Sequence, residues 1–122
     1  MVREDRRKVF IVDDSPLVRE RLINMISEIP TAEVVGQADI AFGASNTIRK
    51  LRPAVVVLDI SMPGGSGLHL LEEIKQNDSA PLVIVLTNFA EEPYKQKCFQ
   101  LGADYFLDKS TEFEKVMDII RT

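Results

Sequence analysis

Short apolar segments rich in Val and Ile alternate along the chain with longer segments in which apolar residues recur every three or four positions. The first pattern is typical of buried strands and the second of amphipathic helices. We predict strands at 8–12, 33–38, 55–59, 82–87 and 104–107. The predicted helices are 16–28, 41–51, 66–77, 91–101 and 111–121. The chain is therefore expected to alternate five strands with five helices.

The first predicted helix carries local signals for its start and for its buried face. Pro16 suits the first helical position, and either Asp14 or Ser15 can cap the helix. The apolar stripe of this helix is expected to contain Leu17, Leu22, Ile26 and Ile29.

The central strands indicate the fold class. The segments VVVL at 55–58 and LVIVL at 82–86 are apolar at every position, which is typical of strands that helices cover on both faces. With right-handed crossovers, the alternation predicts an α/β fold with a doubly wound, five-stranded parallel sheet. The strand order 2-1-3-4-5 is one common arrangement, and periodicity alone does not select it.

Composition narrows the class of protein. The 122 residues, 45% apolar and 28% charged, fit a single domain over 1–122 with a short N-terminal arm at 1–7. A formal net charge of −4 predicts no direct binding to nucleic acid, which requires clustered Lys and Arg. No apolar segment approaches the roughly 20 residues that cross a membrane. The single cysteine, Cys98, suits a buried thiol, so a soluble, cytoplasmic protein without an internal disulfide is expected.

Polar residues follow the predicted strands at the edge where a parallel α/β sheet binds its ligands. Asp13 and Asp14 follow the first strand, Asp59 ends the third, Thr87 ends the fourth and Lys109 comes just after the fifth. Ligands bind at the carboxyl ends of such strands, so we expect these side chains to converge.

Three converging carboxylates repel one another unless a cation is present. Mg²⁺ prefers carboxylate oxygens and often bridges protein to phosphate, so it is the expected cofactor. Phosphoryl transfer to a carboxylate needs an aimed oxygen and positive charge on the transferred group. Asp59 can supply the oxygen, Lys109 the charge and Thr87 a hydrogen bond that arises only after phosphorylation.

Each residue also has an ordinary structural explanation. The Asp13–Asp14 pair can cap a helix, Asp59 can belong to a turn, Thr87 can simply end a strand and Lys109 can be solvated. Taken singly, these explanations are favoured. Together, the placement of all these residue types at successive strand ends favours the chemical interpretation.

The segments IVDDSPLVRERL, VVVLDISMPGGSG, VIVLTN and LGADYFLDKS resemble the receiver domain of two-component response regulators, the family of the chemotaxis regulator CheY. The resemblance covers essentially the whole chain. It implies a (βα)₅ domain with strand order 2-1-3-4-5 that a histidine kinase or phosphotransfer protein phosphorylates on Asp59. Mg²⁺ would be held by the acidic pair Asp13 and Asp14, with Asp14 the direct ligand, by Asp59 and by the backbone carbonyl of Ser61.

The resemblance also implies a switch. Thr87 would move toward the phosphoryl group, and Phe106 would follow and remodel the face of the fourth helix, fifth strand and fifth helix. Many relatives carry Tyr where this chain has Phe106, so a switch here would rest on apolar packing. The neighbouring Tyr105 should point the other way in the strand.

The loops near the site both match the family and depart from it. Pro63 and Gly67 match the loop after the acceptor, whereas Ser110 stands where many relatives have a proline, often with a cis peptide bond. Phe89 flanks the phosphoryl site and is a candidate for restricting the attack of water. His69 is expected to be an exposed polar residue.

Two other functions stay open at the level of sequence. A Mg²⁺-dependent aspartyl-phosphate hydrolase is disfavoured because Ser61 stands where a second acid/base carboxylate would be needed, so we expect no enzyme acting on external substrates. A pseudo-receiver that binds proteins without phosphorylation is the other alternative. The output would be a partner protein, a phosphorylation-dependent homodimer, or a C-terminal effector domain missing from this sequence.

Overall fold

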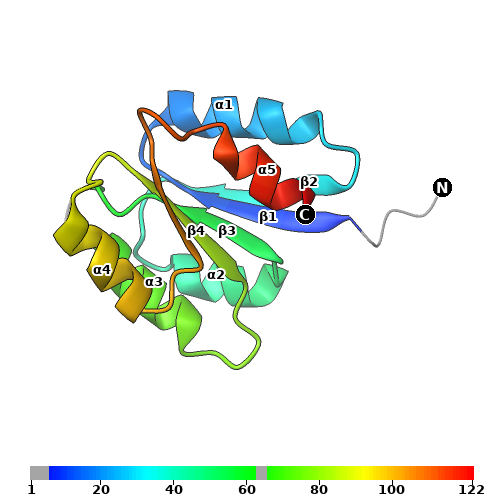
Figure 1. The fold of residues 1–122 in the computed structure, drawn as a ribbon. Helices are drawn as coiled ribbons and strands as arrows, with labels where there is room; N and C mark the ends of the chain where they lie inside the picture. Colours follow the sequence, from blue (N-terminus) through cyan, green and yellow to red (C-terminus); the bar gives the residue numbers. More distant parts are fainter. Residues whose placement is uncertain (1–5, 63–65) are drawn as a thin grey trace.

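Five parallel strands form one sheet in the order β2-β1-β3-β4-β5, with helices on both of its faces (Figure 1). The computed structural model describes residues 6–62 and 66–122. The strands are β1 (Arg7–Val12), β2 (Ala32–Ala38), β3 (Val55–Leu58), β4 (Leu82–Thr87) and β5 (Tyr105–Asp108). The helices are α1 (Pro16–Ser27), α2 (Ala44–Leu51), α3 (Gly67–Lys75), α4 (Glu92–Gln100) and α5 (Lys115–Arg121). The predicted fold class is confirmed, and so is the strand order 2-1-3-4-5, which the family resemblance implies and periodicity alone does not select.

Strand side chains alternate between two cores, one on each face of the sheet. The core beneath α2, α3 and α4 takes Phe10, Val12, Val56, Leu58, Val83 and Val85. The core beneath α1 and α5 takes Val9, Ile11, Val55, Val57, Ile84 and Leu86. Figure 1 shows the two sets of helices on opposite sides of the sheet. Because successive residues of a strand face opposite ways, a strand that is apolar throughout is buried on both faces.

The predicted apolar stripe of α1 is wrong at Leu17, which is 79% exposed. Leu22, Ile26 and Ile29 are buried as predicted. Leu17 lies five residues before Leu22, which rotates it by about 140° around the helix, away from the core face. Ser15 provides the N-cap, because its hydroxyl oxygen accepts a hydrogen bond from the backbone N–H of Val18.

Helix α2 begins at Ala44, three residues later than predicted. Gly43 has a left-handed backbone, with φ of 80°, so the helix cannot extend backward through it. The chain before it forms a loop in which Phe42 is 90% exposed.

Helix α5 begins at Lys115, four residues later than predicted. The preceding residues fold around Asp108, whose Oδ1 accepts hydrogen bonds from the backbone N–H and the hydroxyl of Ser110. The backbone N–H of Asp108 in turn donates to the Glu112 carboxylate. This loop buries Phe113 before the helix starts. The other predicted bounds lie within two residues of the observed ones.

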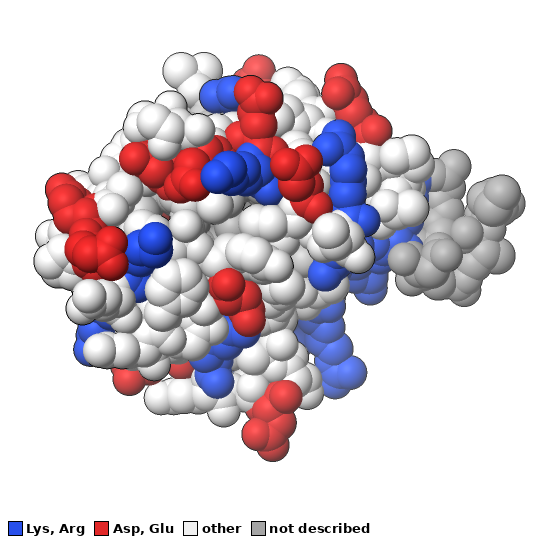
Figure 2. Space-filling view, viewed as in Figure 1, with Lys and Arg blue, Asp and Glu red and all other residues white. Residues whose placement is uncertain are grey.

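The surface carries both signs of charge. Figure 2 shows basic and acidic side chains interspersed on one face, with no continuous basic surface among the described residues there. None of the described helices is long and apolar enough to cross a membrane.

Candidate functional site

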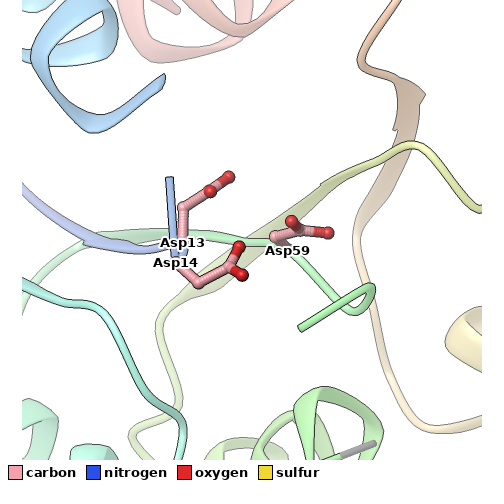
Figure 3. Close-up of side chains that lie close together, drawn as sticks. All are labelled: Asp13, Asp14 and Asp59. Carbon is pink, nitrogen blue, oxygen red and sulfur yellow. The ribbon is translucent and has the colours of Figure 1, made fainter. Parts of the chain in front are cut away.

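Three aspartates meet at the carboxyl end of the sheet. β1 and β3 are neighbours with Val12 opposite Leu58, so the residues that follow these strands share one edge. One carboxylate oxygen from each of Asp13, Asp14 and Asp59 lies within 4.8 Å of the others. Figure 3 shows Asp13 and Asp14 at the end of β1 and Asp59 at the end of β3. The convergence expected from strand ends is therefore present in the structure.

Lys109 bridges two of these carboxylates. Its Nζ lies 2.9 Å from Asp13 Oδ2 and 2.9 Å from Asp59 Oδ2. The lysine side chain is only 11% exposed, and the two carboxylate side chains are 3% and 2% exposed. The backbone N–H of Lys109 donates to the carbonyl of Thr87, which extends the β4–β5 pairing and fixes the lysine at this edge. The ammonium thus neutralises buried charge.

Burial and hydrogen bonding act against each other on these groups. Burial raises the pKa of Asp13, and the charge of Asp59 adds to the rise, while hydrogen bonds from Lys109 and from the Ser15 N–H oppose it. Burial lowers the pKa of Lys109, but its hydrogen bonds and attraction to both aspartates outweigh this effect, so its pKa is raised. Lys109 is therefore held in its charged form.

Asp59 is held from both sides. Its Oδ1 accepts hydrogen bonds from the backbone N–H of Ser61, at 2.8 Å, and from the Ser61 hydroxyl, at 2.5 Å. Its Oδ2 accepts the bond from Lys109. Behind it, a Cβ added at Gly67 would lie 2.6 Å from the Cα of Ile60, so only glycine lets the start of α3 pack against this segment. The carboxylate orientation is fixed by these contacts.

Arg19 is a site residue that the sequence reasoning missed. Its Nη1 donates to the carbonyl oxygen of Asp13 at 2.7 Å, and its Nε donates to Gln37 Oε1 at 2.8 Å. Arg19 therefore anchors the peptide that joins Asp13 to Asp14. The signal was its place one turn after the Ser15 cap, because long helical side chains point back toward the helix N-terminus.

The donor set fits a hard divalent cation. Asp14 is exposed and makes no hydrogen bond or ion pair with any described residue, so its oxygens are available as ligands. The three carboxylates and one ammonium leave two negative charges uncompensated, and carboxylate oxygens are the ligands that Mg²⁺ prefers. The cluster could therefore bind such a metal ion.

Thr87 ends β4 at the same edge of the sheet, and its hydroxyl makes no hydrogen bond with the three aspartates. Its side chain is fully buried, and its hydroxyl oxygen accepts a hydrogen bond of 3.0 Å from the backbone N–H of Phe89. The hydroxyl hydrogen remains available to donate. In β5, Phe106 is 8% exposed and Tyr105 is 40% exposed, so the two point to opposite sides as predicted.

The other sequence predictions concern one peptide bond and three residues. No peptide bond among the described residues is cis, so Lys109–Ser110 is trans. His69 is exposed, and Cys98 is completely buried, as predicted. Pro63 lies outside the described residues.

Comparison with known proteins agrees with this geometry. The family model described as the response regulator receiver domain matches residues 9–121. The response regulator GacA of Pseudomonas aeruginosa is 34% identical over 114 residues, which are 93% of this chain and 53% of GacA. A protein-glutamate methylesterase/protein-glutamine glutaminase of Koribacter versatilis is 39% identical over 109 residues, which are 86% of this chain and 29% of that protein.

A solved structure gives the same result for the fold. The response regulator domain of Thermotoga maritima CheB superposes with a TM-score of 0.85 at 26% identity, covering 95% of this chain and 94% of that one. The chain spans about half the length of GacA and a smaller part of the methylesterase. Because the family model covers nearly all of the sequence and the fold is shared, the chain belongs to the response regulator receiver domain family.

Proposed function

We propose that Asp59 accepts a phosphoryl group from a histidine kinase or phosphotransfer protein, and that this modification is the signal that the domain carries. The observation that supports the proposal is the meeting of three aspartates with one buried, bridging lysine at the carboxyl end of the sheet. In the proposed reaction, a carboxylate oxygen of Asp59 forms a bond to phosphorus. The bond from phosphorus to the donor's nitrogen or oxygen breaks, and the donor leaves with that electron pair.

Each side chain has a task in this reaction. Ser61 and Lys109 hold the Asp59 carboxylate in one orientation, which favours in-line attack. Once Asp59 is phosphorylated to an acyl phosphate, Lys109 exchanges that contact for a phosphoryl oxygen and stabilises its charge. The Thr87 hydroxyl oxygen accepts from the Phe89 N–H, and its hydrogen is left to donate to another phosphoryl oxygen.

The metal site of the proposal uses Asp14 and Asp59 as direct ligands, together with the backbone carbonyl of Ser61. Asp13 lies beside them and is held by Lys109 and Ser15. When bound, Mg²⁺ supplies the positive charge that offsets the carboxylates and the oxygens of the transferred group.

The output side of the proposal is a switch. A hydrogen bond from Thr87 to the phosphoryl group would shift the end of β4. Phe106 pairs with Val85 across the β4–β5 ladder, so it would repack on the α4-β5-α5 face. The output would be a partner protein, a homodimer formed after phosphorylation, or an effector domain of a longer chain. We infer that residues 1–122 act as one receiver unit that catalyses no reaction on external substrates.

Intact mass measurement after incubation with acetyl phosphate and Mg²⁺ tests the proposal. We expect the mass of one phosphoryl group to be added, and peptide mapping to place it on Asp59. Asp59→Asn and a sample in EDTA should show no addition, whereas Asp78→Asn, which changes an exposed aspartate away from the site, should behave as the unaltered protein. A folded, Mg²⁺-binding protein that gains no phosphoryl group would instead be an unphosphorylated interaction module.

A further inference from the structure

A cavity of about 420 Å³ lies between α2 and α3, at the opposite end of the sheet from the aspartates. We call it the α2–α3 pocket; its lining includes Ser45, Ile48, Arg49, Arg52, Glu73 and Ile74. It also touches the segments just before β3 and β4, whereas Asp59 follows the other end of β3. A strand of four residues spans about 13 Å, so the two sites are separate.

Two arginines of the α2–α3 pocket have no partner in the described part of the chain. Neither Arg49 nor Arg52 forms an ion pair or a side-chain hydrogen bond there. Arg52 adopts a left-handed backbone, with φ of 50° and ψ of 57°, and its N–H donates to the carbonyl of Ile48 to end α2. Both arginines are exposed residues that line the same pocket, and no described residue uses their guanidinium donors.

Ser45 adds a hydroxyl to the two arginines of the pocket. It lines the pocket, is only 8% exposed and makes no side-chain hydrogen bond with a described residue. It lies one helical turn before Arg49, so the two side chains share a face of α2. No buried side-chain oxygen or nitrogen of the described residues lacks a partner, so the Ser45 hydroxyl is open to solvent, and an anion held by the arginines would supply an acceptor for it.

The rest of the lining limits what fits. Ile48 and Ile74 are each 4% exposed and form an apolar floor. Glu73 is the acidic residue of the lining, so the two arginines leave a positive balance. A volume of about 420 Å³ is in the range of sites for small molecules. These features disfavour a cation and favour a small anion with an apolar body.

We propose that the α2–α3 pocket binds a small organic phosphate or carboxylate, with its anionic group on Arg49, Arg52 and the Ser45 hydroxyl and its apolar part on the two isoleucines. Such a site would let a metabolite-sized anion bind the domain independently of Asp59. Phosphate and carboxylate share the recognition chemistry, because both accept paired hydrogen bonds from guanidinium groups.

Amide NMR titrations of the ¹⁵N-labelled protein in EDTA test the proposal, with phenylphosphonate and benzoate as two separate probes. Phenylphosphonate cannot phosphorylate Asp59, because its phosphorus is bonded to carbon. We expect saturable shifts confined to residues 45–53 and 73–81. Tighter binding of one probe identifies phosphate or carboxylate as the preferred group.

Lys50→Gln is the matched control for Arg49→Gln. Both changes remove one positive charge from the last turn of α2, but Lys50 does not line the pocket. Arg49→Gln should weaken binding about tenfold or more, the loss expected for a hydrogen bond to a charged group. Lys50→Gln should change it less than about twofold.

Two further variants complete the test. In Arg52→Asn, the asparagine tolerates the left-handed backbone of this position, and the variant should weaken binding as Arg49→Gln does. Ser45→Ala should weaken it to a smaller extent. Dispersed spectra would show that each variant is folded. Shifts that do not saturate, or equal losses for Arg49→Gln and Lys50→Gln, would overturn the proposal, because α2 would then attract anions only through general charge.

Discussion

Replacing Lys109 with methionine should destabilise the metal-free protein strongly. The Lys109 ammonium makes 2.9 Å contacts with Asp13 and Asp59, whose side chains are almost completely buried. Methionine keeps the apolar stem and removes the charge. Two buried carboxylates would then face each other without a cation, so the free energy of the folded state rises while that of the unfolded state does not.

The expected loss in the free energy of unfolding is about 3–5 kcal/mol, the usual effect of removing one partner of a buried ion pair. Protonation of Asp13 relieves part of the loss, since the pKa of this carboxyl is already raised by burial. Small domains are stable by only about 5–15 kcal/mol, so the variant should lose a large fraction of its stability. Lower pH should reduce the difference between Lys109→Met and the unaltered protein.

Urea titrations followed by circular dichroism at neutral pH in EDTA measure this effect. Lys115→Met is the matched control, because Lys115 also lies 2.9 Å from a carboxylate, that of Glu112, but its side chain is 61% exposed. Its loss should stay below about 1 kcal/mol. Repeating the titrations with Mg²⁺ should shrink the deficit of Lys109→Met. Equal losses for the two lysines, or a deficit that neither Mg²⁺ nor acid changes, would refute the reasoning.

Three other predictions follow from the geometry. Because the pKa of Asp13 is raised on folding, stability from this group is present below its ordinary pKa and is lost as pH rises through the raised value. Urea titrations of the metal-free protein above about pH 4 should show this decline, and Asp13→Asn should remove its contribution. Gly67→Ala should cost about 1–3 kcal/mol, since its Cβ would lie 2.6 Å from the Ile60 Cα; an unchanged urea midpoint would contradict this packing. Burial raises the pKa of Cys98 to about 11, so a disulfide reagent should label the native protein far more slowly than the urea-unfolded protein, and equal rates would show that the thiol is accessible.

The fold class was predictable because its signals are local and repeated, whereas the strand order was predicted only from the family resemblance. Apolar runs such as 55–58 and 82–86 report burial on both faces, and their alternation with helices restricts the sheet to few arrangements. Helix starts were less predictable. The start of α5 depends on the loop around Asp108, where the Asp108 carboxylate accepts from the Ser110 N–H and the Glu112 carboxylate accepts from the Asp108 N–H. These hydrogen bonds compete with the helix. Composition cannot show which of these bonds forms.

The members of the site were predictable, but their contacts were not. Because the carboxyl ends of parallel strands share one edge of the sheet, the sequence alone predicted that Asp13, Asp59 and Lys109 converge. It could not show that one ammonium bridges both carboxylates. Nor could it show that Arg19 binds the carbonyl of Asp13, because every residue carries a backbone acceptor and the position of Arg19 near the Ser15 cap does not say which one it reaches. The unpartnered side chains of the α2–α3 pocket are invisible for the same reason, since a missing partner is a property of the folded chain.

The position of Lys109 links the charge at Asp59 to the proposed switch. Its side chain binds Asp59, while its backbone N–H binds the carbonyl of Thr87. Phosphorylation of Asp59 would replace one carboxylate acceptor of Lys109 with phosphoryl oxygens that lie farther from the Asp59 backbone. The lysine would follow its acceptor, and Thr87 is tied to the same residue through the backbone. We therefore expect the ends of β4 and β5 to respond together, even though Phe106 lacks the hydroxyl that a second hydrogen bond would need.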